Sequence, residues 1–124
     1  MAATLDIDAC HADDIRFIVD RAFPFAVAGA KRFGLQLLEV EAKKRPSPCA
    51  AMGICYYNDR KISIVFRYRN AKRDGWKWWR SRLPEHEIFE TIAHELAHLR
   101  HPNHGKDFKA LESEIKAWMN GETA

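Results

Sequence analysis

Hydrophobic residues recur at helical spacing in three separate stretches of this chain. The first stretch begins near Asp13 and extends to Gly34, which suits the end of a helix, and Pro24 is expected to kink or interrupt it. The second covers about residues 85–100, where the apolar side chains share one broad arc. The third covers about residues 106–120, and Gly121 suits its C-terminal cap. The periodicity therefore predicts three helical regions.

Between the first two helical regions the apolar positions follow the alternation of β-strands. Residues 52–57 and 61–68 are β-rich runs separated by Asn58-Asp59-Arg60, which predicts a hairpin, and residues 35–40 predict a further short strand. This order of elements predicts an α+β fold, with an N-terminal helix, a three-stranded and mostly antiparallel sheet, and two C-terminal helices. We expect residues 1–124 to form a single domain.

Composition narrows the class of protein. The chain has 124 residues, of which 47% are hydrophobic and 30% charged, an ordinary globular balance that argues against disorder. Its longest apolar-rich stretch, residues 23–30, is too short to cross a bilayer, and no signal-peptide pattern opens the sequence. Cys10, Cys49 and Cys55 form no CxxC pair. We therefore expect reduced thiols in a cytoplasmic protein that does not associate with membranes.

The helix predicted over residues 85–100 contains His94-Glu95-Leu96-Ala97-His98, a match to the HExxH pattern. Residues four apart lie one above the other on a helix, so the two imidazoles can bind one metal ion. Zinc at such a position lowers the pKa of its water toward neutrality, and Glu95 is close enough to accept the proton. The pattern predicts a metal site with Glu95 as the general base.

A catalytic zinc usually has three protein ligands, so a further residue is required. We expect it to be His104, because Pro102-Asn103 turn the chain after the metal-binding helix and Gly105 gives the backbone freedom there. His101 is expected to support the ligands or to face solvent. The carboxylate alternatives for the third ligand are Glu112 and Glu114.

Around these histidines the sequence resembles the SprT-like zinc metallopeptidases. The resemblance rests on Thr91-Ile-Ala-His-Glu-Leu-Ala-His-Leu and on the following His104-Gly-Lys-Asp-Phe. The YgjP-like and WLM-type minimal proteases are similar in the same HExxH and His-Gly-x-x-Phe pattern. Gly53-Ile-Cys-Tyr-Tyr, followed by Ile62-Ser-Ile, also resembles the Gly-x-Cys and strand motif that precedes the active helix in SprT-like domains. The resemblance extends over residues 51–111, about half of the chain.

The resemblance implies a small zincin-like domain that hydrolyses peptide bonds as an endopeptidase. It implies one zinc ion per chain, with His94, His98 and His104 as ligands and Glu95 as the general base. It also suggests that residues 61–68 form the rim of the substrate cleft, as an edge strand that pairs with the substrate peptide. The candidate substrate-binding residues are Ile64, Phe66, Tyr68 and Trp78.

Basic residues are concentrated in one region. Residues 60–82 contain nine basic side chains against Asp74 alone, and residues 73–82 interleave them with tryptophans. Stacking and phosphate contacts by such a segment can hold single-stranded nucleic acid, with Lys77, Arg80 and Arg82 as candidates. The alternative is that the tryptophans cover the end of a small core or form substrate pockets, while the cations stay solvated.

The sequence thus favours a zinc metallopeptidase that acts on protein or peptide substrates, with DNA or DNA-bound proteins as candidate partners. One alternative is a metal-dependent hydrolase of a non-peptide substrate. The other is a nucleic-acid-binding module with a non-catalytic metal site. Glu95 argues against that module, because a closed structural site has no need of a base.

Overall fold

The computed structural model describes residues 2–5, 12–43, 52–68 and 81–123. Its helices are α1 (Ala12–Phe17), the π-helical turn η2 (Ile18–Ala22), α2 (Phe23–Arg32), α4 (Glu85–His98) and α5 (Lys106–Thr123). Its strands are β1 (Ala2–Leu5), β2 (Glu39–Lys43), β3 (Gly53–Tyr56), β4 (Lys61–Val65), β5 (Arg67–Tyr68) and β6 (Ser81–Arg82). The predicted α+β class is confirmed.

The main sheet is four-stranded, in the order β1-β2-β4-β3, and β5 and β6 form a separate two-stranded sheet. β1 and β2 pair in parallel, as do β2 and β4, whereas β3 pairs antiparallel with β4. The expectation of three mostly antiparallel strands is therefore wrong in number and direction. The α1–η2–α2 segment carries the chain back between β1 and β2, and such a helical crossover makes neighbouring strands parallel.

The hairpin of β3 and β4 forms where the alternating pattern predicts it. The turn lies at residues 57–60, and Arg60 adopts a positive φ of 52°. β2 begins at Glu39, later than expected, and extends to Lys43. β4 is consequently enclosed between β2 and β3, and Ser63 and Val65 on its second face are each only 4% exposed.

The helical boundaries follow local chemistry. Pro24 lies in the first turn of α2, directly after the π-helical turn, so the predicted interruption of the first helix is confirmed. Gly34, with a φ of 66°, follows the end of α2. α5 continues through Gly121 to Thr123, so the expected cap at Gly121 is wrong.

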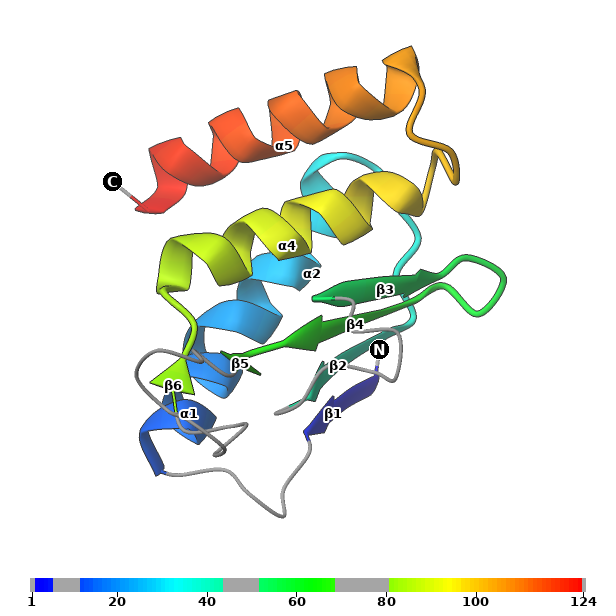
Figure 1. The fold of residues 1–124 in the computed structure, drawn as a ribbon. Helices are drawn as coiled ribbons and strands as arrows, with labels where there is room; N and C mark the ends of the chain where they lie inside the picture. The colour runs from blue at the N-terminus through cyan, green and yellow to red at the C-terminus, as the bar shows by residue number, and fades with distance from the viewer. Residues whose placement is uncertain (1, 6–11, 44–51, 69–80, 124) are drawn as a thin grey trace.

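Helix α4 lies at the centre of the fold (Figure 1). It packs on β3 and β4 with one side, on α2 with another, and α5 lies across it on the side away from the sheet. The arc predicted to face the core is buried, with every member at most 7% exposed: Ile88, Phe89, Ile92, Ala93, Leu96 and Leu99. Within the described residues, no helix combines the length and the apolar character that crossing a membrane requires.

Candidate metal centre

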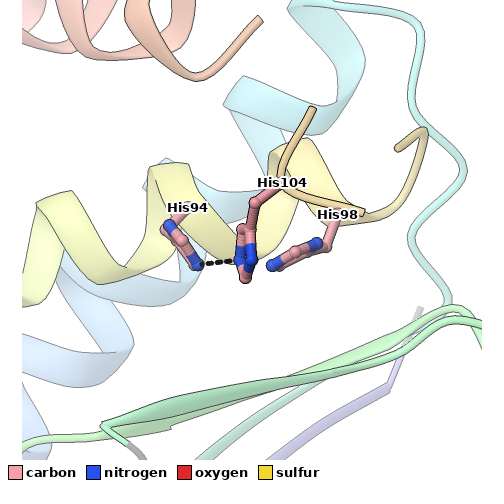
Figure 2. Close-up of side chains that lie close together, drawn as sticks. All are labelled: His94, His98 and His104. Carbon is pink, nitrogen blue, oxygen red and sulfur yellow. Dashed lines mark hydrogen bonds between the residues drawn. The ribbon is translucent and has the colours of Figure 1, made fainter. Parts of the chain in front are cut away.

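Three histidines converge between the end of α4 and the start of α5. His94 and His98 come from consecutive turns of α4, and His104 comes from the segment that joins α4 to α5. Figure 2 shows the three rings turned toward a common point, with a ring nitrogen of His94 facing one of His104. These two Nε2 atoms lie 3.3 Å apart, and one nitrogen from each of the three rings lies within 4.8 Å of the others.

The opposite nitrogens of His94 and His98 have partners of their own. Nδ1 of His94 lies 2.6 Å from Oε2 of Glu112, and Nδ1 of His98 lies 3.1 Å from the backbone oxygen of His101. Both partners accept hydrogen bonds, so each ring carries its proton on Nδ1 when it is neutral. The lone pair of each Nε2 is then free to bind a metal ion.

This donor set fits zinc. Imidazole nitrogens are common zinc ligands, and a tetrahedral ion with bonds of about 2.0–2.1 Å keeps its ligand nitrogens about 3.4 Å apart. The 3.3 Å between Nε2 of His94 and Nε2 of His104 matches that spacing. Two imidazole lone pairs facing each other at this distance repel unless a proton or a cation lies between them. The described residues thus contain a metal-binding histidine group.

The surroundings favour the neutral, metal-binding form of His98. Burial lowers the pKa of His98, and the charges of His94 and His104 act in the same direction, against the hydrogen bond to His101. The ring of Phe108, on the first turns of α5, is only 2% exposed. Its centroid lies 5.0 Å from the ring of His94, 4.4 Å from that of His98 and 5.0 Å from that of His104. The apolar ring of Phe108 therefore packs against all three histidine rings.

Glu95 is buried beside this group, with 5% of its surface exposed. Burial and, to a smaller extent, the negative charge of Glu112 together raise the pKa of its carboxyl to about 7. A carboxyl with a pKa near the working pH is suited to proton transfer. Strand β3 comes very close to it, because a Cβ on Gly53 would lie 2.7 Å from Oε2 of Glu95.

Two hollows meet at Gly53, His94 and Glu95. One, of about 520 Å³, extends toward the beginning of α4, and the other, of about 340 Å³, extends along β3 toward the β3–β4 turn. The first is also lined by Met52, Leu83, Glu87, Glu90, Thr91, Glu112 and Lys116. The second is also lined by Ile54, Cys55, Tyr57, His98, Pro102 and His104. Together they form a cleft along β3, with Glu95 and His94 in its middle.

The strand beside the cleft differs from the predicted one. β3 is the last strand of the sheet, and no strand within the described residues pairs with its other edge, whereas β4 is internal. Ile64 and Phe66 are 3% and 1% exposed in the core, so they offer no surface to a substrate. The expectation that residues 61–68 form the rim is therefore wrong, because β3 lies between β4 and the cleft.

The structure also locates the other predicted residues. Glu112 contacts Nδ1 of His94 and lies on the far side of that ring from Nε2, while Glu114 is exposed. His101 supports His98 through its backbone oxygen. Tyr68 and Arg82 lie in β5 and β6, and their side chains are outside the described part. Trp78, Lys77 and Arg80 also lie outside the described residues.

Two residues at the site received no role from the sequence. Gly53 and Phe108 both belong to the matched motifs. The position of Gly53 beside Glu95 depends on the packing of β3 on α4, and that of Phe108 against the histidines depends on the packing of α5 on α4. The available signals were the glycine in a β-rich run and the phenylalanine four residues after His104.

The fold and the site define a class: a small zincin-like α+β domain with a candidate metal centre of three histidines, two on its HExxH helix and one in the segment that follows. Solved structures of Wss1 have the same fold. Wss1 from Saccharomyces cerevisiae is 15% identical, with a TM-score of 0.75 over 100% of this chain and 93% of that chain. A mutant of the same protein gives a TM-score of 0.76 at 15% identity, over 99% of this chain and 93% of that chain.

Wss1 from S. pombe is similar at lower overlap, with a TM-score of 0.63 and 16% identity over 93% of this chain and 86% of that chain. No family model matches this chain, and no curated protein matches it significantly. At these identities the likeness shows the fold alone. The choice between the SprT-like and the WLM-type branches of the sequence resemblance therefore stays a prediction from the sequence.

Proposed function

We propose that this chain is a zinc-dependent endopeptidase in which His94, His98 and His104 hold the ion and Glu95 is the general base. The observation that carries the proposal is the position of Glu95, buried beside the histidine group at the junction of the two hollows. A purely structural zinc site has no need of a titratable carboxyl facing a cleft. The Wss1-like fold supports the same assignment.

When bound, zinc lowers the pKa of a coordinated water and polarises a substrate carbonyl. The role of Glu95 is to take a proton from water as the water oxygen adds to the carbonyl carbon of the peptide bond. The same carboxyl then delivers that proton to the amide nitrogen as the carbon–nitrogen bond breaks. This leaves one new carboxyl end and one new amino end, and Glu95 is regenerated.

An extended peptide suits the cleft better than a compact non-peptide substrate. Among the described residues no strand pairs with the outer edge of β3, which offers backbone N–H and C=O groups along the length of the cleft. A peptide that adds to this edge would pass over Gly53, directly beside Glu95. This geometry favours peptidase activity over hydrolysis of other substrates.

The finer part of the proposal is that the substrates are proteins associated with DNA. It rests on the resemblance to SprT-like peptidases and on the basic, tryptophan-containing residues 73–82. Charge reversal of Lys77, Arg80 and Arg82 should reduce the salt dependence of binding to single-stranded DNA. An unchanged salt slope would remove these residues from any contact with DNA.

Replacement of Glu95 by Gln tests the peptidase proposal. Glu95→Gln keeps the size of the side chain but removes the base, and we expect cleavage of an unfolded protein such as casein to fall at least about 10²-fold. Zinc content should stay at the wild-type level, because Glu95 is not one of the three histidines. Cleavage by zinc-loaded Glu95→Gln at the wild-type rate would refute the proposal.

A further inference from the structure

Nδ1 of His94 has a charged partner on another helix, and the proposed reaction does not use this contact. The partner is Oε2 of Glu112 on α5, at 2.6 Å. We propose that Glu112 is a positioning residue, which fixes the tautomer and the ring orientation of His94 and thereby strengthens zinc binding. This inference deepens the proposed function and rests on the same metal site.

The geometry separates this role from that of a ligand. The two nitrogens of an imidazole point in different directions, and Glu112 contacts Nδ1 whereas Nε2 faces His104. A carboxylate on the Nδ1 side cannot share an ion with Nε2 of the same ring. Glu112 is thus placed to support the ligand His94 rather than to replace His104 as a third ligand.

Helix α5 holds the ring of His94 with two residues of one face. Phe108 and Glu112 are four residues apart, so they lie one above the other on the helix. The ring of Phe108 meets that of His94 edge-on, with centroids 5.0 Å apart, while Glu112 accepts a hydrogen bond from Nδ1 of His94. The packing of α5 on α4 therefore sets both the position of the His94 ring and its protonated nitrogen.

The carboxylate itself is held in place. Its side chain is 19% exposed, so water competes with the contact only in part. Lys116, one further turn along α5, places Nζ 3.8 Å from the same oxygen. The carboxylate of Glu112 thus has partners on two sides, His94 and Lys116, which restrict its position.

The other α4 histidine provides a contrast. The Nδ1 proton of His98 is donated to a backbone oxygen, so no side-chain substitution removes that acceptor. Of these two histidines, only His94 has a side chain as the partner of its Nδ1. Partners of this kind contribute about 10–100-fold to metal affinity in known sites.

The test compares zinc affinities measured by competition with a chelating dye. Glu112→Ala should bind zinc about 10–100-fold more weakly than the wild type. Glu112→Gln retains an oxygen acceptor and should recover most of this loss. Glu114→Ala is the matched control, because it removes the same charge from an exposed position of α5 and should leave the affinity unchanged.

Proton NMR provides a second readout that a merely structural role would not move. The Nδ1 proton of His94 should give a strongly downfield resonance that shifts in Glu112→Gln and disappears in Glu112→Ala. The inference is overturned if Glu112→Ala binds zinc as tightly as Glu114→Ala. If Glu112→Ala does not fold, an unshifted Nδ1 resonance in Glu112→Gln overturns it instead.

The two proposals fail in different ways. If Glu112→Ala binds zinc as tightly as Glu114→Ala, the positioning role is refuted and the peptidase proposal stays intact. Absence of cleavage by the zinc-loaded wild type refutes the peptidase proposal, while the affinity comparison still decides the role of Glu112.

Discussion

Strand β3 comes close to helix α4 at Gly53, and an added methyl group there has a calculable effect. A Cβ at this position would lie 2.6 Å from Cγ2 of Thr91, 2.7 Å from Oε2 of Glu95 and 3.0 Å from its Cγ. Ordinary contacts between carbon atoms are about 3.5–4.0 Å long, so Gly53→Ala requires a displacement of about 1 Å. The atoms that must move belong to Thr91, to Glu95 or to β3 itself.

Two effects should follow from this displacement. Overpacking of this kind costs about 1–3 kcal/mol, which lowers the melting temperature of a domain of this size by roughly 3–12 °C. A shift of about 1 Å in a catalytic group can reduce turnover about 10²-fold. Zinc affinity should change little, because the nearest atoms to the new methyl belong to Thr91 and Glu95 rather than to a histidine.

The assay combines thermal unfolding, zinc competition and casein cleavage on the same preparations. Gly121→Ala is the matched control, since a Cβ there has no neighbour within 4 Å and the residue lies inside α5. It should stabilise the fold by up to about 1 kcal/mol and leave cleavage unchanged. Wild-type melting temperature and turnover in Gly53→Ala would refute the close approach of β3 to Glu95.

Three further predictions concern single groups. His101→Ala should retain wild-type zinc affinity in the dye competition, because the acceptor for His98 is the backbone oxygen; a tenfold loss would contradict this. Burial raises the pKa of Glu41, but the hydrogen bond from Ser63 and the nearby lysine charges outweigh it and lower the pKa. The ionised carboxylate therefore stabilises the fold above its usual pKa of 4.5, and this contribution is lost as pH falls through the lowered pKa. In urea titrations, Glu41→Gln should thus lose less stability on acidification than the wild type. Burial and, to a smaller extent, the charge of Glu95 raise the pKa of the Cys55 thiol to about 11. Mass spectrometry should therefore show slower alkylation of Cys55 at mildly alkaline pH in the native protein than in urea, and equal rates would contradict this.

The convergence of the three histidines was predictable because it depends mostly on local geometry. The spacing of His94 and His98 on one helix places both rings on one side, and the short segment to His104 limits where its ring can lie. The core arc of α4 is equally local, since 3.6-residue periodicity determines it. Neither feature depends on how distant segments of the chain pair.

The cleft was not predictable in the same way. Which strand forms the edge depends on whether β2 adds beside β3 or beside β4, and alternation along a strand does not encode that choice. Ile64 and Phe66 therefore received a substrate role, although Ile64 lies in the internal strand β4, Phe66 directly follows it, and both side chains are buried. The contact between Glu112 and His94, which are 18 residues apart in the sequence, likewise depends on how α5 packs on α4.

The binding of zinc by the three histidines is the claim on which the proposed function depends, and elemental analysis tests it most directly. Purified wild-type protein and His94→Ala are compared after identical treatment with added zinc and dialysis. We expect about one zinc ion per chain in the wild type and its loss in the variant, as a site of three protein ligands requires. No stoichiometric zinc in the wild type, or equal zinc in both proteins, would contradict the account.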